Sequence, residues 1–297
     1  MEVSTDKAGR APITIEALRK DYLSWALVGI SLAIVFVMYQ HTMARWWEMW
    51  WATDSRYSHG ILVPFISAFA VYAERDRLSK VEIRPNLVLG TVALALVMLT
   101  GMVYRAARIP SMESVAFPLF ILSAIVLLLG VRMAYALIFP CLFLLFMVPW
   151  PGFLLAKTES ATQLWSTAAA TQILHVFFKE ASHEGITILM PSVAVKVATA
   201  CSGFRTLISL FAFSTFFAYM KDGPRLGRIA LVLSALPLGL VANSIRITLV
   251  ALVGEFWGED VMHAFHDYSG YMMLVVAFVA LELISRVLKC RKFRLAL

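Results

Sequence analysis

Residues 86–104 read NLVLGTVALALVMLTGMVY, an apolar run that contains no charged side chain. At the 1.5 Å rise of an α-helix, a segment of this length spans about 28 Å, close to the hydrocarbon thickness of a bilayer. The apolar residues are continuous rather than alternating, and a helix satisfies its own backbone hydrogen bonds in hydrocarbon. The run therefore predicts a transmembrane helix.

Runs of the same kind recur along the rest of the chain. Hydrophobic residues make up 60% of the 297 residues, charged residues make up 15%, and the mean hydropathy is +0.78. A soluble domain carries about a quarter charged residues, so this composition excludes an ordinary soluble protein. We predict an all-α polytopic membrane protein with about eight helical spans, near residues 22–42, 58–74, 86–104, 114–131, 133–150, 203–220, 228–250 and 268–287.

Residues 159–178, ESATQLWSTAAATQILHVFF, fit either a ninth span or an amphipathic helix in the membrane interface. Lysine and arginine concentrate in cytoplasmic loops, so their distribution separates the two possibilities. With the N-terminus inside, 17 of the 26 basic residues are cytoplasmic if the segment does not cross, and 13 if it does. We favour the first arrangement, with both termini inside: a cytoplasmic tail at 1–21, a single transmembrane domain at 22–287 and a basic tail at 288–297.

The net charge of +7 does not indicate nucleic-acid binding, because the basic residues form short clusters between apolar runs. The predicted partner of these surfaces is membrane lipid. Three scattered cysteines are too few for a disulfide framework or a zinc site. The sequence has no His, Cys and carboxylate cluster and no glycine-rich phosphate loop, so we expect no metal and no organic cofactor.

One predicted external loop differs from the rest. In residues 185–199, GITILMPSVAVKVAT, three valines alternate with Ala194, Lys196 and Ala198, and Pro191 and Ser192 supply a turn. This alternation predicts two short β-strands just before Cys201.

Three side chains with catalytic chemistry fall at one predicted depth. Cys201, Arg246 and His266 lie 20, 18 and 20 residues from basic residues predicted to be cytoplasmic. These offsets correspond to roughly 27–30 Å of helix, which places each residue near the outer interface, at the end of a different helix. A thiol beside an imidazole forms a nucleophile and base, and a guanidinium can stabilise an oxyanion. A packed cysteine, a snorkelling arginine and an interfacial histidine fit the same spacing.

The motifs around these residues resemble those of the exosortase/archaeosortase family. ACSGFRTL (200–207), NSIR (243–246) and HDYSG (266–270) follow one another in the family's order. Upstream, RYSHGILVPFIS (56–67), VPWPGFLL (148–155) and the run from Glu184 to Cys201 extend the resemblance over about residues 46–287. The residues Phe204-Arg205-Thr206 after C-S-G, and FFKEASHEG before the loop, depart from the family's pattern.

The resemblance implies Cys201, Arg246 and His266 as catalytic residues. Neighbouring residues have possible supporting roles: Arg205 as a competing arginine, His263 as a competing histidine one helical turn from His266, His59 in the motif YSHG, and Asn243, Ser202 and Gly203. A helix beginning after Ser202 and Gly203 would favour the thiolate. Asp267 is expected to be a solvated loop charge.

The implied activity is that of a cysteine protease or transpeptidase at the outer face of a bacterial inner membrane. The implied substrates are exported proteins with a C-terminal signal made of a short motif such as Pro-Glu-Pro, a transmembrane helix and a basic tail. One alternative is a transporter or channel, for which Pro237 and Gly239 would break a helix near the midplane. Another is a membrane acyltransferase, which also uses Cys and His. The oligomeric state is not predicted.

Overall fold

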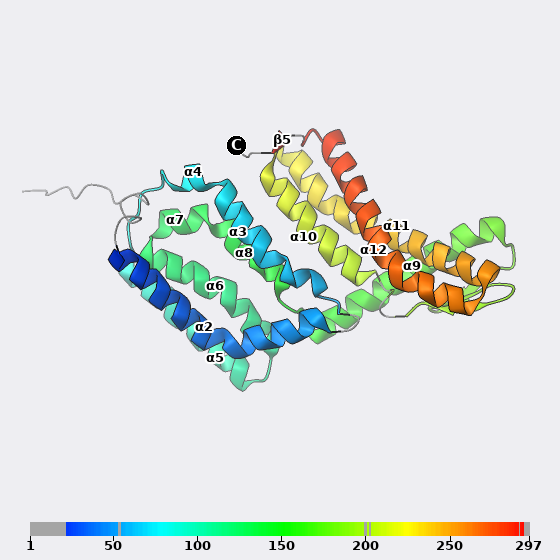
Figure 1. Ribbon diagram of the computed structural model, residues 1–297, viewed down its shortest axis with the longest axis horizontal. Coiled ribbons are helices and arrows are strands. Elements are labelled where there is room, and N and C mark those ends of the chain that lie inside the picture. The colour runs from blue at the N-terminus through cyan, green and yellow to red at the C-terminus, as the bar shows by residue number, and fades with distance from the viewer. Residues whose placement is uncertain (1–21, 53–54, 199–200, 202, 291, 294–297) are drawn as a thin grey trace, which may run out of the picture. The chain divides into compact units, whose positions relative to one another are not determined.

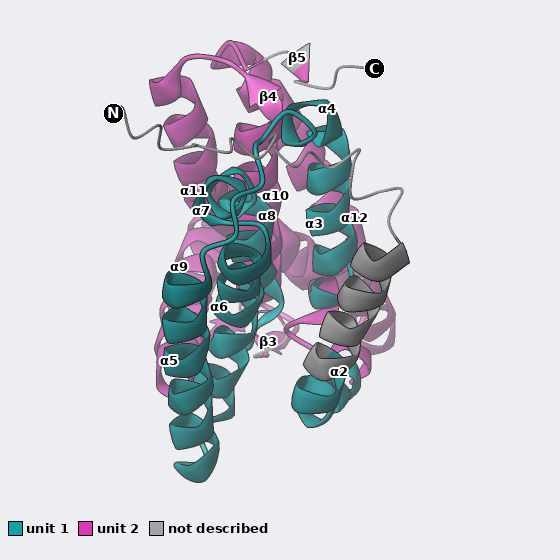
Figure 2. Cartoon of the chain, turned by 90° about the vertical axis from the view of Figure 1, so that its left-hand side faces the viewer, with its two compact units in different colours: residues 1–49, 60–149, 296–297 teal, residues 50–59, 150–295 magenta. Residues whose placement is uncertain are grey.

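The computed structural model describes residues 22–52, 55–198, 201, 203–290 and 292–293 (Figure 1). The chain divides into two compact units, coloured separately in Figure 2. Unit 1 comprises residues 1–49, 60–149 and 296–297, and unit 2 comprises residues 50–59 and 150–295. The predicted tail at 1–21 lies outside the described residues, and the single domain at 22–287 stays a prediction.

The regular elements of unit 1 in its described part are helices. Asn86 begins its most apolar helix, because the Asn86 side chain accepts a hydrogen bond from the backbone N–H of Leu89 at 3.0 Å. At Gly90 an added Cβ would lie 2.4 Å from the Cα of Leu127, so glycine permits the close packing of α5 on α6. The helices that begin in unit 1 are α2 (Tyr22–Trp51), α3 (Val63–Ala73), α4 (Arg75–Leu78), α5 (Leu87–Ala106), α6 (Pro110–Leu128), α7 (Val131–Ala136), α8 (Ile138–Phe143) and the 3-10 helix η2 (Leu144–Met147).

A buried carboxylate joins three of these helices. Glu113, in the first turn of α6, accepts hydrogen bonds from Thr42 and Arg45 of α2 at 3.0 and 2.7 Å. Arg105, at the end of α5, donates to the same carboxylate at 3.0 and 2.7 Å. Because a buried charge needs such partners, this contact holds α2 against the end of α5 and the start of α6.

Unit 2 holds three long helices that pack side by side, α10, α11 and α12 (Figure 1). Gly239 of α11 faces the Cα of Leu207 of α10, which an added Cβ would approach to 3.3 Å. Pro237 does not break α11, which is continuous past it, so the helix break that would have suited the transporter alternative is not present at Pro237 and Gly239. The elements of unit 2 are α9 (Gly152–Phe177), β1 (Ser182–Glu184), β2 (Thr187–Leu189), β3 (Ala194–Lys196), α10 (Phe204–Met220), β4 (Lys221–Asp222), α11 (Arg225–Trp257), α12 (Glu259–Val287) and β5 (Lys292–Phe293); a 3-10 helix, η1 (Ser58–Ile61), crosses the boundary between the units.

The predicted β-like loop forms a small antiparallel sheet of order β1-β2-β3. Val193, Val195 and Val197 are buried and the residues between them are exposed, as the alternation predicts. The sheet has one more strand than predicted, because Gly185 at φ +58° turns the chain back and lets β1 pair with β2.

The helices agree with a polytopic membrane protein, but the described residues do not establish eight spans. Within the described residues, four helices are long and apolar enough to cross a membrane: α5, α6, α11 and α12. A fifth span results if the bent pair Ile138–Met147 and Gly152–Phe177, which meet at 75°, counts as one. The predicted span 133–150 is not one straight helix, because it divides into α7, α8 and η2, with Pro140 inside it and Pro149 and Pro151 at its end.

The ambiguous segment 159–178 belongs to the continuous helix α9. Most of its polar residues, including Gln163 and Thr167, are buried; Ser160 and Gln172 are exposed, as are Trp165 and Val176 at 64% and 70%. An amphipathic helix in the interface presents its polar face to water, and α9 turns that face inward. Its apolar outer face fits contact with lipid.

Candidate active site

The structure brings Cys201 and His266 into direct contact although 65 residues separate them. Cys201 is buried just before α10, and its Sγ forms a hydrogen bond with Nε2 of His266. His266 lies on α12, and its side chain is 24% exposed. A thiol and an imidazole in this geometry can exchange a proton, which is what a nucleophile and its base require.

Arg246 and His266 do not lie at helix ends, which corrects part of the predicted placement. Helix α11 continues eleven residues past Arg246 to Trp257, and α12 begins seven residues before His266 at Glu259. Gly258 makes the tight turn between them at φ +86°. The polar sequence between the two apolar runs is helical, because backbone hydrogen bonding continues where hydropathy falls. Only Cys201 directly precedes a helix, as predicted.

Contacts from three elements fix the backbone around Cys201. Gln163 of α9 donates its side-chain N–H to the carbonyl of Val197, and the N–H of Cys201 donates to the carbonyl of Ala198 at 2.8 Å. Asn243 of α11 donates Nδ2 to the carbonyl of Cys201 at 3.0 Å. These hydrogen bonds therefore fix the position of the backbone that carries the Cys201 thiol.

Gly203 permits this packing. It adopts φ +81° at the start of α10, a conformation that favours glycine. An added Cβ would lie 2.7 Å from Cγ of Asn243. Ser202, another predicted supporting residue, lies outside the described residues.

Arg246 is buried and contacts the helix that carries His266. Its Nε donates to Oγ of Ser269 at 3.0 Å, and Nη2 donates to the carbonyl oxygen of His266 at 3.1 Å. The Ser269 hydroxyl donates to the same carbonyl at 2.9 Å and is itself buried. The guanidinium therefore holds the turn of α12 on which the imidazole sits, and it retains further donors for another ligand.

A cavity of about 130 Å³ adjoins the Cys201–His266 contact. His263 lines it as well, but the thiol contacts His266. Lys196 adds an exposed cation from β3. Arg205 and His59, both half-buried, are not among its lining residues. The residues that line the cavity are Val195, Lys196, Val197, Ala198, Cys201, Arg246, Ile247, Val250, Met262, His263 and His266.

The upstream motifs support the start of α10. Arg56 forms an ion pair with Glu159 of α9. The hydroxyl of Tyr57 accepts a hydrogen bond from the backbone N–H of Trp150 at 2.8 Å, and both aromatic rings pack edge-on against Phe204. Burial raises the pKa of the Tyr57 phenol, which stays a neutral packing group. Tyr57 and Trp150 thus support Phe204, the residue three positions after Cys201.

Sequence reasoning missed three residues of this site. Asp267, expected to be a solvated charge, lies with Oδ1 3.2 Å from Nδ1 of His266. Ser269 lies within the motif HDYSG, but its position there does not indicate that it contacts Arg246. Gln163 is a buried amide, and the hydropathy of its segment does not indicate its hydrogen-bond partner. Within the part of the chain that the structure describes, no group of three or more His, Cys, Asp or Glu side chains could hold a metal ion.

We expect Asp267→Asn to reduce substrate cleavage by less than about tenfold. A buried triad aspartate is worth about 10⁴-fold, but the Asp267 side chain is 79% exposed and its charge is screened by water. Initial rates of Asp267→Asn and Asp267→Ala, measured beside Asp260→Asn as an exposed control on the same helix, test this. A loss near 10⁴-fold in Asp267→Asn would make this carboxylate a full member of a triad.

The fold and the site define a class: a polytopic helical membrane protein with a buried cysteine held against a histidine. Residues 46–283, about four fifths of the chain, match the family described as transmembrane exosortase (EpsH exosortases), and the chain belongs to this family. No curated protein and no solved structure shows significant similarity to the chain.

Proposed function

We propose that this exosortase is a cysteine protease or transpeptidase that cleaves the C-terminal sorting signals of exported proteins. The observation that carries the proposal is the contact between Sγ of Cys201 and Nε2 of His266 beside a cavity. Family membership gives the reaction class, and this contact supplies a nucleophile and a base for it.

In the proposed reaction, Nε2 of His266 takes the thiol proton and Sγ of Cys201 attacks the scissile carbonyl carbon. The tetrahedral intermediate collapses as the C–N bond breaks, and the imidazolium returns the proton to the leaving amine. The product is a thioester on Cys201 and a released C-terminal segment. Water or an amine then attacks the thioester, passes a proton to His266, and regenerates the thiol.

Arg246 has two roles in this proposal. Its bonds to Ser269 and to the His266 carbonyl position the imidazole. Arg246 also lines the cavity, where its remaining N–H donors would bind the substrate carbonyl and stabilise the oxyanion. Asn243 positions Cys201 through the backbone carbonyl. We assign Arg205, His263 and His59 supporting roles only.

We further propose that the site faces the outside of the inner membrane and that the chain crosses the membrane eight times. If α8, η2 and α9 together form one broken span, this is the fifth span, and α9 makes no separate crossing. The loops then lie on the sides that place 17 of the 26 lysines and arginines in the cytoplasm and 9 outside. The substrate helix would then lie against the spans with its basic tail in the cytoplasm and its motif at the outer interface.

This topology predicts the labelling of two introduced cysteines by a membrane-impermeant maleimide. Ser192 and Arg225 are exposed and flank α10, so they should lie on opposite sides of the membrane. In spheroplasts, Ser192→Cys should react and Arg225→Cys should react only after lysis. The native thiols Cys141, Cys201 and Cys290 are all buried, so the unsubstituted protein provides the background.

The reverse pattern, with Arg225→Cys labelled from outside and Ser192→Cys protected, would mean that α9 makes an additional crossing. The candidate site would then face the cytoplasm. In that case the outer-face assignment fails, while the cysteine chemistry of the site could still be measured with purified protein.

Cleavage of a defined substrate tests the activity. The full chain is co-expressed with an exported reporter that ends in a motif, a transmembrane helix and a basic tail, with the motif randomised. Mass spectrometry of the released reporter gives the cleavage position, and an added amine distinguishes transfer from hydrolysis. A reporter with its basic tail deleted is the control. Absence of processing across the motif library would contradict the proposal.

The same experiment separates the alternatives. A membrane acyltransferase would use the Cys201–His266 pair, but Cys201 would carry a fatty acyl group rather than a peptide. A transporter would leave the reporter intact. No described feature favours either one, and the unbroken helix through Pro237 removes a feature that would have suited a transporter.

A further inference from the structure

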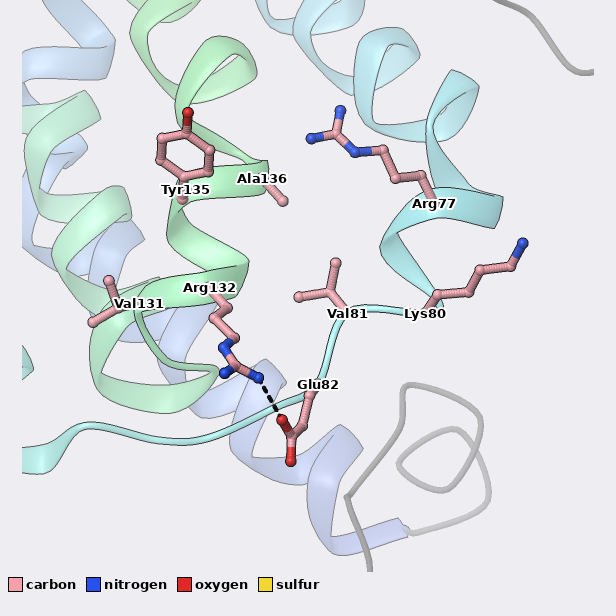
Figure 3. A pocket seen from close by; sticks show the side chains of 8 residues that line it. All are labelled: Arg77, Lys80, Val81, Glu82, Val131, Arg132, Tyr135 and Ala136. Carbon is pink, nitrogen blue, oxygen red and sulfur yellow. Dashed lines mark hydrogen bonds and ion pairs between the residues drawn. The ribbon is translucent and has the colours of Figure 1, made fainter.

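Unit 1 contains an open cavity of about 690 Å³ whose lining is rich in basic side chains. Figure 3 shows its two walls, one at the end of α4 and the other at the start of α7, with the loop that carries Val81 and Glu82 running from the end of α4 past Arg132. The guanidinium of Arg77 extends from the first wall toward the second (Figure 3). The lining residues are Arg77, Lys80, Val81, Glu82, Val131, Arg132, Tyr135 and Ala136.

The charge of this region is not balanced. Residues 74–84 together with Arg132 hold five basic and three acidic side chains. Glu82 is shared, because one carboxylate oxygen contacts Nε of Arg84 at 2.7 Å and the other contacts Nη1 of Arg132 at 2.6 Å. Among the described residues, the guanidinium of Arg77 pairs with Glu74 at 2.8 Å, and because the Arg77 side chain is 58% exposed, this pair contributes little to stability and exchanges readily. The cavity therefore favours an added anion.

Backbone contacts hold the two walls together. The N–H of Arg84 donates to the carbonyl of Leu129 at 3.2 Å, and the N–H of Asn86 donates to that of Val126 at 3.2 Å. At Gly130, φ is +92°, and an added Cβ would lie 1.9 Å from the carbonyl oxygen of Arg84. Because Gly130 has no Cβ, the turn before α7 can pack directly against the loop at Arg84. The backbone that forms the cavity is therefore fixed by these contacts.

The cavity lies where two candidate membrane spans end. Helix α5 begins three residues after Arg84, and α6 ends three residues before Val131. Two apolar lining residues face outward, Val131 at 47% and Tyr135 at 75% exposed. A soluble anion would contact only the basic side chains of the cavity. A lipid would contact these side chains with its headgroup and the exposed Val131 and Tyr135 with its acyl chains. We propose that this cavity binds the phosphate headgroup of an anionic phospholipid, with its acyl chains along Val131 and Tyr135.

Lipid titration of the purified full-length chain tests this site, independently of any catalytic role. Delipidated protein in detergent is titrated with phosphatidylglycerol, with phosphatidylcholine of the same acyl chains, and with glycerol phosphate, and bound species are counted by native mass spectrometry. We expect phosphatidylglycerol to bind most tightly. In Arg77→Gln/Lys80→Gln/Arg132→Gln, its affinity should fall on the order of a hundredfold, because each basic residue near a membrane surface contributes about fivefold.

Two further variants make the result decisive. A charge-matched control, Lys157→Gln/Lys179→Gln/Arg225→Gln, removes three exposed cations outside the cavity and should keep wild-type affinity. Glu82→Gln frees Arg84 and Arg132 and should increase phosphatidylglycerol affinity, a gain that misfolding cannot produce. Equal losses in both triple variants, or unchanged affinity in the cavity variant, would overturn the proposal. Glycerol phosphate binding as tightly as the lipid would mean a site for soluble anions instead.

Discussion

Cys201→Ala should abolish cleavage of a tail-signal substrate while the protein remains folded and inserted. The nucleophile forms the covalent intermediate, and removal of such a residue lowers turnover by at least about 10⁴-fold in comparable enzymes. No other described cysteine contacts a histidine: Cys141 lies in α8, and Cys290 packs against Leu231 and Leu281. Loss of processing by immunoblot, with the substrate accumulating at full length, is the expected readout.

Cys141→Ala provides a matched control, because Cys141 and Cys201 are each 6% exposed. Both substitutions remove one buried sulfur and should lower thermal stability by similar small amounts, but only Cys201→Ala should lose activity. Hydroxylamine release of a trapped acyl-enzyme should likewise require Cys201. Processing that survives in Cys201→Ala and not in Cys141→Ala would overturn the nucleophile assignment.

The membrane character and the β-like loop could be predicted from the sequence because both depend on local periodicity. Continuous apolar runs predict helices, and the valine alternation at 193–197 predicts strands. Where helices end is a different matter. Hydropathy falls after residue 250 and rises again near 268, yet α11 and α12 continue through this stretch to a turn at Gly258. A helix ends where its backbone partners end, and hydropathy does not record that.

In the candidate site as well, local sequence features could be predicted, whereas contacts that depend on the packing of the fold could not. Spacing placed Cys201, Arg246 and His266 at one depth, and the resemblance linked them, but neither gives the partners of a side chain. That Arg246 reaches Ser269 and the carbonyl of His266 depends on the packing of α11 on α12. Gln163 illustrates the limit most clearly. Its amide lowers the hydropathy of α9, but in the fold it holds the strand that leads to Cys201.

Arg246→Ala should lower cleavage by about 10²–10³-fold, whereas Arg205→Ala should keep much of its activity. Loss of one preorganised donor to an oxyanion costs about this much, and Arg246 lines the cavity beside the thiol. Arg205 is the second residue of α10, the helix that follows Cys201, and it is not among the lining residues. Arg246→Lys should recover only part of the rate, because an ammonium cannot reproduce a planar fork of donors.

Ser269→Ala separates positioning from charge stabilisation. If Arg246 acts only by holding α12, Ser269→Ala should reproduce much of its loss, and the double variant should be no worse than Arg246→Ala alone. If the guanidinium also binds the oxyanion, Ser269→Ala should cost less than about tenfold, because Arg246 would keep its charge and its bond to the His266 carbonyl. We expect the second result. Initial rates at equal protein levels compare the two arginine variants directly. If Arg205→Ala is inactive and Arg246→Ala is active, the roles assigned to the two arginines are reversed.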